Sequence, residues 1–94
     1  MDQLKEMVLK EMADEPVRVL LFGSRAKGTH RSGSDVDIAF VPKTRMSWSR
    51  ISFLREKIEA SCIPYKVDIV DLSEASEEFC TQALKDAVIW KNWN

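Results

Sequence analysis

Two aspartates separated by a single residue, Asp35 and Asp37, follow closely after a Gly-Ser dipeptide at positions 23 and 24. Alternate side chains of an extended strand project from the same face, so both carboxylates would point one way while Val36 points into a core. Hard cations such as Mg²⁺ take oxygen ligands and usually bind through one or two carboxylates plus the phosphates of a substrate. The pattern therefore predicts metal-assisted phosphoryl or nucleotidyl transfer.

A third acid, Asp68, lies in residues 65–71, a second run typical of a strand. Its apolar neighbours would bury one face of that strand and bring the carboxylate into line beside the first two. Three acids on two strands could hold two metals about 3.5–4 Å apart, the arrangement that clamps the attacking and leaving oxygens of an in-line displacement. We expect the three carboxylates to bind Mg²⁺ or Mn²⁺.

The Gly-Ser dipeptide would supply the phosphate half of the site. Gly23 ends a predicted strand at 17–22 and lets the backbone approach a ligand closely, and a short helical turn over 24–27 would stop at Gly28, which takes positive φ without steric cost. Free N–H groups at the start of the turn, with the Ser24 hydroxyl, would point at an anion. Arg25 is the best candidate among nearby cations because it adjoins Ser24.

The combined pattern resembles the DNA polymerase beta-like nucleotidyltransferase superfamily, and within it the minimal nucleotidyltransferases, from Val17 to about Trp90. The positions that carry the resemblance are Gly23, Ser24, Gly28, Ser34, Asp35, Asp37 and Asp68. The resemblance implies a nucleoside triphosphate held at Gly23 and Ser24. Arg25, which adjoins Ser24, and Ser34 are further nucleotide-binding candidates. It also implies metal at the aspartates, with Asp68 activating the acceptor hydroxyl.

By the same resemblance, the expected reaction moves a nucleoside monophosphate, AMP from ATP, to a hydroxyl acceptor such as a side chain of a partner protein. The expected assembly is a homodimer or a complex with a small helical HEPN-type protein. The alternative is a non-catalytic nucleotide-binding antitoxin that neutralises a HEPN-type toxin by direct binding. Replacing Asp35 and Asp37 by Asn would abolish the first activity and spare the second.

Each piece also has a plainer interpretation. Gly23 and Ser24 could form an ordinary strand-to-helix turn. The aspartates could be the solvated faces of amphipathic strands. The whole could be an inactive copy of the fold, although all three acids are present.

Composition narrows the function classes. The 94 residues suggest a single domain over 1–94, and 45% hydrophobic with 31% charged residues is typical of a globular chain. No apolar run approaches the ~20 residues of a membrane span, and the N-terminus has no secretory pattern, so we expect a soluble, cytoplasmic protein. A net charge of −1 makes long nucleic acid an unlikely partner. The cations expected to flank the site are local: Arg25, Lys27, Arg31, Lys43 and Arg45.

Periodicity predicts an α/β fold with a small mixed sheet covered by helices, in the order αβ(α)βαβα. The predicted helices are 2–13, 47–61 with Ser47 as its cap, and 74–91, and the predicted strands are 17–22, 35–41 and 65–71, with the short turn at 24–27. The last helix would bury Phe79, Cys80, Ala83, Leu84, Ala87 and Val88.

Five remaining residues have no predicted chemistry. Cys62 and Cys80 are expected to be core residues with free thiols. Trp90 and Trp93 either form an interface or fold back on the protein's own core. His30, the only histidine, is expected to be polar surface.

Overall fold

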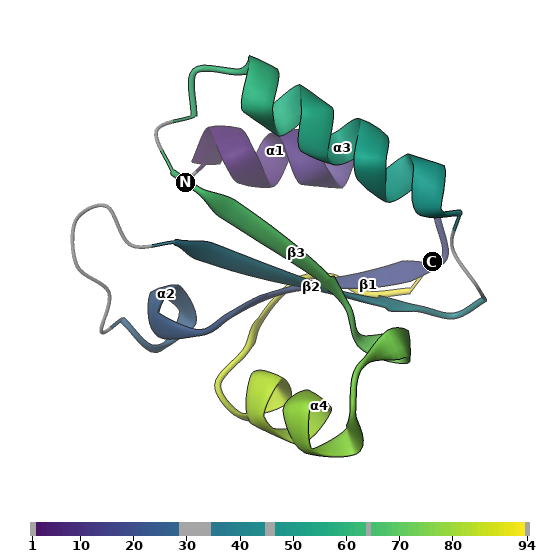
Figure 1. Cartoon of the computed structure of the whole chain (residues 1–94), viewed down its shortest axis with the longest axis vertical. Helices are drawn as coiled ribbons and strands as arrows, with labels where there is room; N and C mark the ends of the chain where they lie inside the picture. The colour runs from purple at the N-terminus through teal and green to yellow at the C-terminus, as the bar shows by residue number, and fades with distance from the viewer. Residues whose placement is uncertain (1, 29–34, 45–46, 64, 94) are drawn as a thin grey trace.

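The computed structural model describes residues 2–28, 35–44, 47–63 and 65–93 (Figure 1). Within these residues the chain forms a mixed four-stranded sheet in the order β3-β2-β1-β4. The strands are β1 (Val17–Phe22), β2 (Val36–Pro42), β3 (Val67–Asp71) and β4 (Val88–Lys91). β1 is antiparallel to both β2 and β4, whereas β2 and β3 are parallel.

Helices cover both faces of the sheet (Figure 1). α1 (Asp2–Glu11) and α3 (Trp48–Ala60) lie side by side on one face, and α4 (Glu77–Lys85) lies on the other. The short α2 (Ser24–Lys27) follows β1, and a 3₁₀ turn over Leu72–Glu74 connects β3 to α4. The predicted α/β class with a mixed sheet covered by helices is confirmed.

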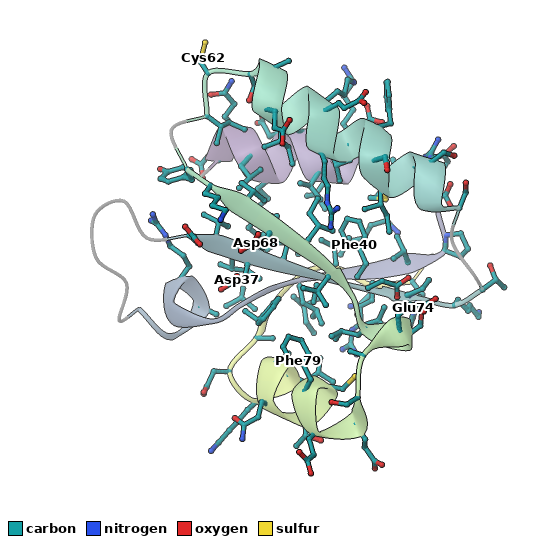
Figure 2. All side chains as sticks on the ribbon, viewed as in Figure 1. Asp37, Phe40, Cys62, Asp68, Glu74 and Phe79 are labelled. Atoms are coloured by element: carbon teal, nitrogen blue, oxygen red, sulfur yellow. The ribbon has the colours of Figure 1, made fainter. Side chains whose placement is uncertain are left out.

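The two faces differ in the size of their cores. Under α1 and α3 a cluster of thirteen buried side chains fills the space: Leu4, Val8, Met12, Val17, Val19, Leu21, Val36, Ile38, Phe40, Ile51, Leu54, Ile58 and Ile69. Under α4, among the residues that the structure describes, the buried set is smaller: Leu20, Ala39, Leu72 and Ala83. Figure 2 shows Phe40 on the α1 and α3 side and Phe79 on the α4 side. The face of the sheet under α4 is therefore less covered than the face under α1 and α3.

The C-terminal part differs most from the sequence prediction. The helix expected over 74–91 is replaced by the 3₁₀ turn, α4 and the strand β4, which pairs Val88 with Leu21 and Ile89 with Leu20. Phe79, Leu84 and Val88, which were expected to be buried, are exposed. A short apolar run cannot be assigned to helix or strand by periodicity alone, and the free edge of β1 can hydrogen-bond a strand.

Smaller differences concern element ends and caps. β2 and β3 begin at Val36 and Val67, one and two residues later than expected, and α1 ends at Glu11. Ser47 occupies the N-cap position of α3, but its hydroxyl lies 2.7 Å from the Ser49 hydroxyl and makes no capping bond to the backbone.

The two cysteines differ in burial, and the two C-terminal tryptophans both contact the rest of the protein. Cys62 is exposed (Figure 2), so its prediction as a core residue is wrong. Cys80 is half-buried, and its thiol donates to the Leu72 carbonyl at 3.3 Å. Trp90 packs against the larger core, and the Trp93 indole N–H donates to the Val41 carbonyl at 2.7 Å. The C-terminal end thus folds back on the protein.

In the described part of the chain, no helix is both long enough and apolar enough to cross a membrane.

Candidate functional site

Asp37 and Asp68 are direct partners in the parallel ladder between β2 and β3. The next pair along, Ile38 and Ile69, lies in the core beneath α1 and α3. Because side chains alternate along a strand, the two aspartates project from the opposite face, the one that α4 covers. Figure 2 shows both near the end of the sheet where α2 lies. The predicted approach of Asp68 to the first pair is confirmed.

Asp35 lies immediately before β2 and is exposed, rather than inside the strand as expected. Its charge still affects the pKa of Asp37. Partial burial, then the carboxylates of Asp68 and Asp35, raise the pKa of the Asp37 carboxyl above its ordinary value. Like charges held this close favour a cation between them.

The Asp37 carboxylate lies where a side chain at Gly23 would be. Gly23 adopts a φ of +76°, and a Cβ added to it would meet the Asp37 Oδ2 atom well inside 3.0 Å, closer than real Cβ contacts come. Gly28, which ends α2 as predicted, has a similar φ of +75° but open space around its α carbon. Of these two glycines, Gly23 is the one whose lack of a side chain lets a carboxylate lie against the turn.

Arg25 extends from α2 toward the start of β3. Its guanidinium carbon lies 4.7 Å from the centroid of the Tyr65 ring, two residues before β3 begins. Tyr65 in turn packs against the larger core. Sequence reasoning missed this contact, although the place of Tyr65 in the run that carries Asp68 was a usable signal.

α3 fixes the strand that carries Asp68. The Arg55 guanidinium donates from Nη2 to the Ile69 carbonyl at 2.9 Å, on the exposed edge of β3. This bond holds the residue next to Asp68 in the chain.

Of the other predicted site residues, Ser24 lies at this end of the sheet, Lys43 does not, and some cannot be placed. Lys43 follows the far end of β2, about 20 Å of strand from Asp37 at roughly 3.3 Å per residue, so the prediction that it flanks the site is wrong. Ser24 begins α2 next to Gly23. Ser34, Arg31 and Arg45 lie outside the described residues, as does His30, which was expected to be polar surface.

The carboxylates fit a hard cation that also takes oxygen ligands from the phosphates of a bound substrate. Among the residues that the structure describes, no three potential ligand side chains converge closely enough to hold a metal by themselves. Two neighbouring carboxylates on one face, one with its pKa raised first by partial burial and then by the other carboxylate, still match the oxygen donors that Mg²⁺ or Mn²⁺ accepts beside phosphate oxygens.

Paired aspartates beside a Gly-Ser turn, on a mixed sheet with helices on both faces, define a nucleotidyltransferase domain. Residues 2–92 match the family model described as Polymerase beta, Nucleotidyltransferase, and the chain belongs to this family.

Two curated relatives are similar in sequence. The protein adenylyltransferase MntA of Shewanella oneidensis is 34% identical over 88 residues, which are 89% of this chain and 63% of the relative. A Haemophilus influenzae protein named "Probable protein adenylyltransferase MntA" is 34% identical over 61 residues, 65% of this chain and 54% of the relative. The chain thus spans between half and two thirds of the length of these relatives.

Solved structures share the fold. A toxin-antitoxin crystal structure with AMP-PNP has a TM-score of 0.74 and 28% identity, over 94% of this chain and 73% of that chain. A complex of a tri-AMPylated Shewanella oneidensis HEPN toxin with an MNT antitoxin has a TM-score of 0.69 and 24% identity, over 97% and 71% of the two chains. At that lower identity, the second likeness concerns the fold alone.

Proposed function

We propose that this protein is a metal-dependent nucleotidyltransferase that moves AMP from ATP to a hydroxyl group of a partner protein. The observation that carries the proposal is the register pair Asp37 and Asp68, held against the Gly23 turn. Membership of the family and the names of the two relatives, both protein adenylyltransferases, support the choice of AMP and of a protein acceptor.

In this proposal, the nucleotide lies across the turn and the carboxylates. The backbone at Gly23 and Ser24 would face the phosphates, with Arg25 and Ser34 as further contacts, and Asp35 and Asp37 would hold Mg²⁺ or Mn²⁺. The bound cation supplies neutralisation of the phosphate charge. The carboxylates repel one another, which favours a cation between them. Because they do not complete the cation's set of ligands, the phosphates are needed as well, so nucleotide and metal should bind together.

Asp68 is proposed to act on the acceptor. It is exposed at the edge strand β3, so a hydroxyl from another molecule can approach it. The acceptor oxygen forms a bond to the α-phosphorus, the bond from that phosphorus to the bridging oxygen breaks, and pyrophosphate leaves. Asp68 takes the hydroxyl proton.

The partner is proposed to be a small helical HEPN-type protein, with a homodimer as the other possible assembly. The similarity to a toxin-antitoxin structure supports a two-protein module. Long nucleic acid stays an unlikely partner because the net charge is only −1. A cytoplasmic location remains a prediction.

The test is to co-express the chain with the protein encoded beside it and to weigh that protein before and after addition of ATP and Mg²⁺. We expect a mass increase by one or more adenylyl groups. The variant with Asp35→Asn and Asp37→Asn should add none while the complex stays intact. Co-purification without any mass change in the wild-type complex would instead favour a non-catalytic antitoxin.

Asp68→Asn separates chemistry from binding. It should keep most of the ATP affinity, because the first two acids and the turn remain, and lose transfer. Wild-type turnover by this variant would return Asp68 to the solvated face of an ordinary strand.

A further inference from the structure

A small pocket opens between the end of β1 and α4. It measures about 190 Å³ and is lined by Phe22, Gly23, Phe79, Gln82, Ala83 and Asp86. Pockets that hold a whole drug-sized ligand measure about 300–1,000 Å³, so this one suits a single ring system.

The pocket is continuous with the carboxylate site. Gly23 lines the pocket and also packs against the Asp37 carboxylate. Phe22 is the ladder partner of Asp37, and its ring joins the cluster beneath α4, so pocket and carboxylates share one face of the sheet. A nucleotide with its phosphates at the turn would have its nucleoside within reach of this pocket.

The walls offer an aromatic surface and polar groups. The Phe22 and Phe79 rings meet edge to face, with centroids 6.0 Å apart and an interplanar angle of 83°. Phe79 points from α4 toward the sheet, yet 42% of its surface is exposed (Figure 2). The helix buries Ala83 instead. A ring that is held in place but left partly uncovered can stack on a flat ligand.

We propose that this pocket is the nucleobase subsite and that it selects adenine. Phe79 stacks on the base, and the Gln82 amide reads the adenine N6 and N7 edge, a pairing that suits one donor and one acceptor. The Asp86 carboxylate adds an acceptor for the N6 amino group and disfavours guanine, which presents the acceptor O6 at that position. This inference rests on the proposed nucleotidyl transfer and names the part of its substrate that is recognised.

The test compares ATP, GTP and inorganic tripolyphosphate, each titrated calorimetrically with Mg²⁺ into the protein. Wild type should bind ATP more tightly than GTP or tripolyphosphate. Phe79→Leu should weaken ATP at least about fivefold, as expected for loss of one stacked base, and leave tripolyphosphate unchanged. Phe79→Tyr, which keeps the ring, should restore ATP affinity. Gln82→Ala should narrow the preference for ATP over GTP.

Leu84→Ala is the matched control, because Leu84 lies on the same helix, is 44% exposed and does not line the pocket. It should change no affinity. If wild type binds tripolyphosphate and ATP equally, or if Phe79→Leu binds ATP as wild type does, the subsite is refuted while the proposed transfer stands. If wild type binds none of the three ligands, the proposed function itself fails, and the subsite with it.

Discussion

Asp37 is the residue that the surrounding sequence constrains most. Asp68 is its neighbour across the parallel ladder, Asp35 precedes it by two residues, and Gly23 has no side chain where its carboxylate lies. Each of these features is costly or neutral for folding alone, since acids repel and a glycine loses more entropy than other residues. Together they are what the proposed binding of a cation and a phosphate at this point would require.

The raised pKa of Asp37 predicts how stability depends on pH without metal. The folded protein holds the Asp37 proton more tightly than the unfolded chain, whose value is about 3.8, so stability falls as pH rises above that value. Asp37→Asn carries no such charge. In EDTA at pH 7, its melting temperature should exceed that of wild type, and the difference should shrink toward pH 4. A variant less stable than wild type at pH 7 would contradict the destabilisation that burial and the neighbouring carboxylates cause at the ionised Asp37.

Gly23 and Gly28 form a matched pair for testing the steric role of the turn. Both have positive φ, so alanine at either position should cost about 1–2 kcal/mol of unfolding free energy in strain. Only at Gly23 would the new Cβ also collide with the Asp37 carboxylate. Gly23→Ala should therefore lose at least tenfold in affinity for Mg²⁺ and ATP, whereas Gly28→Ala should bind nearly as wild type. Urea titration and calorimetry measure the two effects separately.

At the scale of elements, α4 is the helix that distinguishes the two faces of the sheet. It is nine residues long and contributes one buried side chain, Ala83. Its start is fixed by Ser76, whose hydroxyl accepts from the Phe79 N–H at 3.1 Å. The cap therefore sets the position of Phe79 as well as the start of the helix.

Ser76→Ala should lower the unfolding free energy by about 1 kcal/mol, because an N-terminal N–H of α4 loses its acceptor. Ser47→Ala is the control: Ser47 occupies the same position before α3 but makes no capping bond, so its replacement should be nearly neutral. Denaturant unfolding of both variants compares the two caps. Equal losses would show that the Ser76 hydrogen bond contributes nothing to stability.

At the scale of the molecule, sequence patterns predicted what depends on local spacing. The strand at 17–22, the turn at 24–27 and the helix near 47–61 follow from alternation, glycine positions and an apolar stripe, and β2 and β3 follow from runs of β-branched residues. The pairing of Asp37 with Asp68 was expected from sheet adjacency. The strand β4 was not predictable in this way, because its run, Val88 to Lys91, is short and becomes a strand only by pairing with the free edge of β1. The pocket between the end of β1 and α4 was not predictable either, because the sequence analysis expected one helix over 74–91 in place of the shorter α4.

The whole domain should respond to metal and nucleotide only when both are present. No three described side chains form a finished metal cage, so each ligand needs the other to complete its contacts. At concentrations about 100-fold above the dissociation constant, binding stabilises the folded state by about 2.7 kcal/mol, or more than about 10 °C in melting temperature for a domain of this size. Mg²⁺ alone or ATP with EDTA should give much less, which differential scanning fluorimetry can measure. The variant with Asp35→Asn and Asp37→Asn should abolish the joint effect, and an equal rise with ATP in EDTA would show that nucleotide binding does not depend on the carboxylates.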